Sequence, residues 1–256
     1  MTAVGDADHE RQIGDLIARM TRDQKVAQLQ IAYRPRFEDA AALVRGGIGA
    51  VFWPGNAERT NELQRIARDE SPHGIPLLVG LDVIHGQYTI FPTPLAQASS
   101  FDPEVAAIDG RVSAAEATSG GVNWTFSPMI DVSRDARWGR IVEGFGEDPY
   151  LTSVFGAAKV RAYQGDDLDS KSSLLACAKH FVAYGHAEGG RDYNTVDLSL
   201  NLLHSVYLPP FRAAVDAGAA SVMASFNTVA GRPMHANHEL LTSVLKDEWG
   251  FPGVVV

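Results

Sequence analysis

The chain alternates between short apolar runs and longer segments in which apolar residues recur every three or four positions. The longer segments predict amphipathic helices, of which Ile13, Leu16, Ile17 and Met20 give the first example. The short runs are bounded by Gly or Pro, which is typical of strands buried on both faces of a parallel sheet. Six strands are expected at residues 48–53, 76–81, 122–126, 174–178, 221–225 and 253–256, and 29–32 is the candidate for a seventh at the start.

Local end signals support the helices between these strands. Thr21 followed by Gln24 predicts a capping box, and Gly46-Gly47 predicts the end of a helix over residues 39–45. Asp148 followed by Pro149 predicts another helix start. The remaining helices are expected at residues 57–69, 103–119, 151–164, 200–217 and 239–249.

Buried strands that alternate with helices predict a parallel sheet with right-handed crossovers. The chain has 256 residues, close to the roughly 250 of one α/β barrel. No Gly-rich phosphate fingerprint follows the first strand and no G-x-x-x-x-G-K-[ST] motif occurs, which counts against a nucleotide-binding fold. We therefore expect one α/β domain over residues 1–256, a TIM-barrel-like (β/α)8 fold.

The amino-acid composition limits the classes of partner and site that the chain is expected to have. Lys and Arg number 22 against 31 Asp and Glu, so 22 − 31 gives a net charge of −9, which argues against nucleic acid and anionic membranes. The single cysteine, Cys177, excludes an internal disulfide and a Cys-cluster metal site, and its apolar run predicts a buried thiol. No apolar stretch reaches the roughly 18 residues of a membrane span. No signal peptide is readable in MTAVGDADHERQ, so the chain as written is expected to be soluble and would be cytoplasmic, while its compartment is left open.

Polar side chains follow several of the predicted strands, where parallel α/β folds bind ligands. Asp82 follows the strand at 76–81, Asp131 and Arg140 follow the next, and Lys179 and His180 follow the strand at 174–178. Side chains of both charges that converge at one rim suit a ligand with many hydroxyls, because each hydroxyl both donates and accepts. No H-E-x-x-H or G-x-S-x-G motif is present.

Three segments carry a family resemblance. They are LDVIHGQYTIFP at 81–92, DVSRDARWGRIVEGFGEDPY at 131–150 and AKHFVAY at 178–184. These segments resemble the N-terminal domain of glycoside hydrolase family 3. The loop HAEGGRDYNTVD at 186–197 is similar to the branch of bacterial periplasmic β-glucosidases, and relatives in that branch are often exported.

The resemblance implies an exo-acting retaining β-glucosidase that removes terminal β-D-glucosyl residues with two carboxylates. Its substrates would be β-linked glucosides or oligosaccharides, and it implies no cofactor or metal. Asp82 would accept hydrogen bonds from two sugar hydroxyls, and Met223 would line the pocket. The same ring would receive hydrogen bonds from Arg140, Lys179 and His180, and Arg191 matches a basic position near the sugar.

Several of these residues also have a purely structural interpretation. Asp82 is also suited to cap the following turn, and Arg137 and Glu143 are interpreted as structural ion-pair residues. Lys179 and His180 are adjacent, so an ideal strand would direct them to opposite faces; the resemblance implies a cis peptide between them. His85, His186 and His235 are assigned structural roles, and Phe226 stands where many relatives have Tyr.

The family's nucleophile is an Asp in a Ser-Asp pair expected directly after Val256, and its acid/base lies still later. We therefore expect no catalytic residue in this chain, a barrel that is truncated before it closes, no second domain, and possible association through the open barrel edge. Two alternatives stay open: a β-xylosidase of the same family, and a non-catalytic sugar-binding remnant. A β-N-acetylhexosaminidase is the weaker choice, because the His-Asp loop of that branch is not seen.

Overall fold

The computed structural model describes residues 7–52 and 55–256, which form two compact units. The first unit runs to Leu81 and includes Ser119–Asn123, and the second holds Asp82–Thr118 and Trp124–Val256. Residues 1–6 and 53–54 lie outside the described part, and with them the last residue of the strand expected at 48–53.

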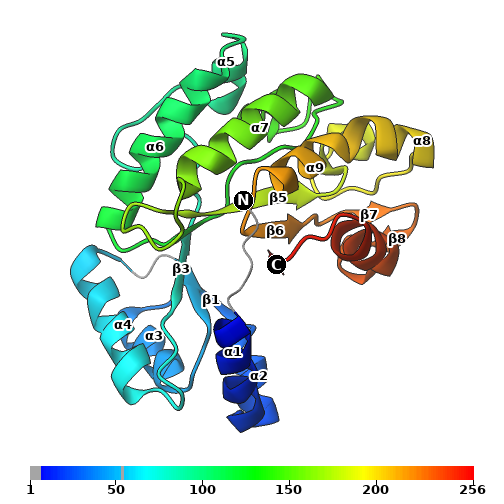
Figure 1. The fold of residues 1–256 in the computed structure, drawn as a ribbon. Helices are drawn as coiled ribbons and strands as arrows, with labels where there is room; N and C mark the ends of the chain where they lie inside the picture. The colour runs from blue at the N-terminus through cyan, green and yellow to red at the C-terminus, as the bar shows by residue number, and fades with distance from the viewer. Residues whose placement is uncertain (1–6, 53–54) are drawn as a thin grey trace. The chain divides into compact units, whose positions relative to one another are not determined.

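The first unit holds three parallel strands, with Ile31 opposite Ala50 and Ala50 opposite Leu78 in register. Helices α3 and α4 pack against each other beside these strands (Figure 1). In chain order the elements are α1 (Ala7–Arg19), α2 (Arg22–Gln28), β1 (Ile31–Tyr33), α3 (Phe37–Arg45), β2 (Ala50–Phe52), α4 (Ala57–Glu70) and β3 (Leu78–Leu81).

The second unit holds four parallel strands in the order β4-β5-β6-β9, and helices α6, α7 and α9 lie side by side along them (Figure 1). Its helices are α5 (Pro94–Ala98), α6 (Pro103–Ser119), α7 (Pro149–Gln164), α8 (Leu200–Leu202) and α9 (Pro209–Asp216). Its strands are β4 (Trp124–Thr125), β5 (Leu175–Phe181), β6 (Ser221–Ala224), β7 (Thr228–Val229), β8 (Arg232–Pro233) and β9 (Val254–Val255). Short 3-10 turns cover Ile141–Glu143, Tyr184–His186, Glu188–Gly190 and Met234–Ala236, and π-helical segments cover Leu203–Tyr207 and Glu239–Glu248.

The helix-capping residues predicted from the sequence cap helices in the structure. The Thr21 side chain accepts from the Gln24 backbone N–H, and the Gln24 side chain accepts from the Thr21 N–H, so the capping box is confirmed. The Asp148 carboxylate caps α7 through the Leu151 N–H, with Pro149 in the first turn. Helix α3 ends at Gly46, and Gly47 has a φ of 88°, which favours glycine.

Close packing in the second unit rests on small residues. The buried face of α6 includes Ala106, Gly110 and Ala114 at helical spacing. A Cβ on Gly110 would lie 2.6 Å from the Cβ of Ala162 on α7, so glycine lets the two helices approach. Strand β5 is buried along nearly its whole length, as expected for a central parallel strand. Cys177 on this strand is buried, as predicted, and burial raises the pKa of its thiol to about 12.

Three features differ from the expectation. The helix expected at 200–217 is broken, because Pro209 and Pro210 remove N–H donors and force a π-helical segment before α9. The helix expected at 239–249 has π-type hydrogen bonding over Glu239–Glu248. An antiparallel hairpin of β7 and β8 was not predicted; its turn uses Ala230 and Gly231, both with positive φ.

No helix in the described ranges combines the length and the apolar character needed to cross a lipid bilayer.

Gly49→Ala is expected to destabilise the first unit by about 1–3 kcal/mol, because overpacking forces backbone shifts. A Cβ at Gly49 would lie 2.0 Å from the carbonyl oxygen of Gln28. Gly14, inside α1, has nothing within 4 Å of such a Cβ, so Gly14→Ala is the control and should stabilise by about 0.5–1 kcal/mol. Urea unfolding of both variants measures the difference, and equal midpoints would contradict the prediction.

Candidate functional site

A group of charged side chains lies together in the second unit around Lys179. This lysine is buried near the end of β5, and its Nζ lies 2.7 Å from Asp82 Oδ1 and 3.9 Å from Glu143 Oε2. The Asp82 side chain remains 42% exposed. The structure therefore places the Asp82 carboxylate against Lys179, with one side open to solvent.

Arg140 and Glu143 form a two-point ion pair beside this lysine. Arg140 Nε lies 2.5 Å from Glu143 Oε1, and Arg140 Nη2 lies 2.8 Å from Oε2. Burial would raise the pKa of Glu143, but the Arg140 hydrogen bonds and the charge of Lys179 outweigh it, so the pKa lies below its usual value. Burial opposes the charge of Arg140, yet the Glu143 contacts raise its pKa. Both groups are charged at neutral pH.

Arg137 and Glu143, which were interpreted as structural ion-pair residues, pair with different partners in the structure. Arg137 is largely exposed and pairs with Asp135, at 2.6 Å, while Glu143 pairs with Arg140. The reason is local: the Asp135 carboxylate also accepts from the Arg137 backbone N–H. The Arg137 side chain, hydrogen-bonded to Asp135, lowers the pKa of that carboxyl to about 2. Glu143 thus belongs to the charged group at Lys179.

His180 follows Lys179 in the chain and is almost completely buried. The Lys179–His180 peptide is cis, as the resemblance implies. His180 Nδ1 lies 2.8 Å from Asp131 Oδ2, and the His180 backbone N–H donates to the same oxygen at 3.0 Å. Lys179 and His180 therefore bind different carboxylates, Asp82 and Asp131.

Aromatic side chains flank these charges. The Arg140 guanidinium lies over the Tyr184 ring, 5.7 Å from its centre. The Tyr184 hydroxyl donates to Asp192 at 2.5 Å, and Trp138 Nε1 donates to the same carboxylate oxygen at 3.0 Å. Phe226 is half exposed and packs against the His180 and Tyr184 rings. Sequence reasoning did not single out Tyr184 or Trp138, although both lie inside the quoted motifs.

Two candidates lie at the margin of this group. Met223 on β6 is opposite Lys179 in the strand register and is partly buried. Arg191 is exposed in the loop that follows the turn Glu188–Gly190, and within the described part of the chain its side chain forms no ion pair with the site carboxylates. The structure brings Asp82, Lys179 and Arg140 together, and Arg191 is not among them.

Two of the histidines assigned structural roles bind within the fold. His85 Nδ1 lies 2.9 Å from the Phe91 carbonyl oxygen, and His186 Nδ1 lies 2.6 Å from the Tyr207 hydroxyl. His235 belongs to the turn Met234–Ala236. Across residues 7–52 and 55–256, no group of three or more His, Cys, Asp or Glu side chains is arranged to hold a metal ion.

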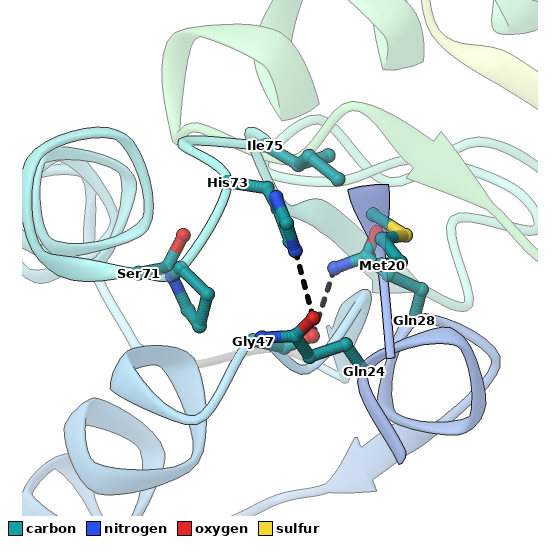
Figure 2. A pocket seen from close by; sticks show the side chains of 8 residues that line it. Met20, Gln24, Gln28, Gly47, Ser71, His73 and Ile75 are labelled. Carbon is teal, nitrogen blue, oxygen red and sulfur yellow. Dashed lines mark hydrogen bonds between the residues drawn. The ribbon is translucent and has the colours of Figure 1, made fainter. Parts of the chain in front are cut away.

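A small cavity in the first unit is a different kind of site. Figure 2 shows His73 directed at Gln24, with Nε2 2.9 Å from Oε1, and Gln28 Nε2 donates to the Gly47 carbonyl at 2.8 Å. The cavity measures about 10 Å³, which is room for roughly one water molecule. It is too small for a sugar. Its lining residues are Met20, Gln24, Gln28, Gly47, Ser71, Pro72, His73 and Ile75.

Comparison with known proteins decides the family. The model of the glycosyl hydrolase family 3 N-terminal domain matches residues 21–256. The chain belongs to glycosyl hydrolase family 3. This confirms the resemblance drawn from the motifs around Asp82, Arg140 and Lys179.

Curated relatives of this family 3 chain include β-glucosidases and β-xylosidases. The chain is 43% identical over 248 residues to the periplasmic β-glucosidase of Salmonella typhimurium, covering 95% of this chain and 32% of that protein. It is 35% identical over 255 residues to a β-xylosidase of Formosa agariphila, covering 98% of this chain and 32% of that protein. The chain thus spans about a third of the length of these relatives.

Solved structures confirm the fold class. A mutant β-glucosidase from Listeria innocua in complex with laminaribiose matches with a TM-score of 0.91 and 39% identity, covering 96% of this chain and 37% of that one. The glucose complex of the Listeria innocua β-glucosidase matches with a TM-score of 0.90 and 40% identity, with the same coverage of both chains. The fold is the TIM-barrel-like domain of family 3, and seven of its parallel strands are present in the described residues.

Proposed function

We propose that this family 3 chain supplies the sugar-binding surface of a retaining exo-β-glucosidase and holds a terminal β-D-glucosyl residue. The observation that carries the proposal is the group of Asp82, Arg140, Glu143 and Lys179, in which carboxylates and cations alternate. Lys179 hydrogen-bonds to Asp82, Arg140 hydrogen-bonds to Glu143, and Glu143 lies 3.9 Å from Lys179. A sugar hydroxyl can accept from Lys179 while it donates to Asp82, so such a group suits a polyol. The glucose complex of the Listeria innocua β-glucosidase supports the choice of sugar.

Binding at this surface would contribute to catalysis if it strengthened as the substrate approached the transition state. Glycoside hydrolysis passes through an oxocarbenium-like state, and hydrogen bonds to ring hydroxyls strengthen there. Lys179 and Arg140 are held in place by Asp82 and Glu143, so little reorganisation is needed when the sugar arrives.

The carboxylates of this surface are engaged in ways that suit binding rather than attack. Asp82 faces Lys179, Glu143 faces Arg140, Asp131 holds His180, and Asp192 accepts from Tyr184. We propose that the nucleophile and the acid/base lie outside these 256 residues, as the family resemblance implies.

The 256-residue chain is expected to bind glucose without hydrolysing a nitrophenyl β-glucoside. Binding is measured by isothermal titration calorimetry with D-glucose, and hydrolysis by release of nitrophenol over a blank. Release above the blank that survives repurification would show that one of the engaged carboxylates acts in catalysis.

The xylosidase alternative is tested in the same titration. D-xylose lacks the hydroxymethyl group of glucose, so a glucosidase surface should bind it more weakly. The higher identity to the β-glucosidase than to the β-xylosidase, 43% against 35%, favours glucose. Tighter binding of xylose than of glucose would reverse this assignment.

A further inference from the structure

The carboxylate of Asp131 serves His180 in two ways. One oxygen, Oδ2, accepts the His180 backbone N–H at 3.0 Å and lies 2.8 Å from ring atom Nδ1. The Asp131 side chain is fully buried, and its other oxygen, Oδ1, has no hydrogen-bond partner within the described part of the chain. Because Oδ2 already acts as an acceptor for the backbone N–H, the short contact to the same oxygen places the ring proton on Nδ1 of the imidazole.

The surroundings of the ring keep it neutral. Burial lowers the pKa of His180, and the nearby charges of Lys179 and Arg140 lower it further, while Asp131 opposes them. Glu143 also lies close enough to the His180 ring for the two groups to interact electrostatically. The ring packs edge-to-face with Tyr184, 5.1 Å between centres, and lies tilted against Phe226. Its second nitrogen, Nε2, has no hydrogen-bond partner among the described residues.

We propose that Asp131 is a positioning residue that keeps the proton on Nδ1 of His180 and so presents Nε2 as a hydrogen-bond acceptor to a sugar hydroxyl. This inference rests on the proposed sugar-binding function. It reverses the donor role that the family resemblance implies for His180. A neutral imidazole that donates through one nitrogen can only accept through the other.

The consequence is a second kind of selectivity at the surface. Lys179 and Arg140 only donate hydrogen bonds, so they tolerate any electronegative substituent on the sugar ring. An acceptor nitrogen requires a substituent that carries a hydrogen. The hydroxyl opposite His180 is therefore recognised as a donor, and a fluorine or methoxy group at that position weakens binding.

The proton position is tested without any sugar. In the chain labelled with ¹⁵N-histidine, nuclear magnetic resonance at pH 7.5 distinguishes protonated from unprotonated ring nitrogens, and His180→Gln identifies the signals of His180. We expect the proton on Nδ1 and a bare Nε2. A proton on Nε2 would overturn the proposal. Asp131→Asn retains an acceptor oxygen and should keep the tautomer, whereas Asp131→Ala should yield a mixture of the two.

The acceptor role is tested with glucose in which single hydroxyls are replaced by fluorine. One position should lose about tenfold in affinity on fluorination, the value of roughly one hydrogen bond, and that loss should disappear in His180→Ala. Losses at positions that face Asp82 should persist in the same variant. If fluorination losses are unchanged by His180→Ala at every position, His180 accepts no hydroxyl proton. If glucose itself does not bind, the proposed function fails, and the resonance experiment still decides the tautomer.

Discussion

Lys159→Met is expected to lower the free energy of unfolding by about 3–5 kcal/mol, the cost of leaving a buried charge without its partner. Lys159 on α7 donates to Asp109 on α6, and both side chains are essentially inaccessible to solvent. Asp109 also accepts hydrogen bonds from Gln97 and Ser113, at 2.7 Å each. The variant leaves a carboxylate buried with neutral donors only.

Urea unfolding followed by circular dichroism measures this loss. The double variant Asp109→Asn with Lys159→Met removes both charges and keeps acceptors and donors for Gln97 and Ser113, so it should recover part of the stability. Arg111→Met is the control on α6, because Arg111 pairs with Glu104 at the exposed surface, where a salt bridge contributes at most about 1 kcal/mol. Equal losses for Lys159→Met and Arg111→Met would contradict the role of burial.

The strand pattern was readable from the sequence because a parallel strand is buried on both faces. The strands that contain Cys177 and Val222 could each be located from a run of apolar residues with a turn at its end. Very short elements were not predicted, because they hold too few residues to show a periodic pattern. Helix α5 has five residues, and the β7–β8 hairpin depends on positive φ at Ala230. Periodicity also gave no warning of the π-helical bonding before Pro209, because the apolar pattern does not register the N–H donors that Pro209 and Pro210 lack.

The sequence indicated side chains that the fold brings close together, but not how they pair. Asp82, Arg140, Lys179 and His180 were found because they follow strands and match family motifs. That Glu143 pairs with Arg140, and that Asp131 holds His180, depends on contacts made in the folded chain. The Asp109–Lys159 pair was missed for the same reason, since a helix pattern places charged residues on the solvent side.

Lys179→Met is expected to weaken glucose binding at least about 30-fold, the equivalent of losing one partner of a buried charge pair, roughly 2 kcal/mol or more. Lys179 is buried, and its ammonium lies next to Asp82 and within 3.9 Å of Glu143. Removing it takes away the donor proposed to bind the sugar and removes the ion-pair partner of the Asp82 carboxylate. Titration calorimetry with D-glucose gives the dissociation constant.

Lys171→Met is the matched control, because Lys171 is exposed in the segment between α7 and β5. It should bind glucose as the unmodified chain does. Asp82→Asn serves as a second variant at the site. The amide oxygen can still accept from Lys179, and Glu143 remains 3.9 Å from that ammonium, so the fold should tolerate the change while the acceptor for the sugar is weakened. Unchanged glucose affinity in both Lys179→Met and Asp82→Asn, with circular dichroism spectra like that of the unmodified chain, would place the sugar elsewhere on the protein.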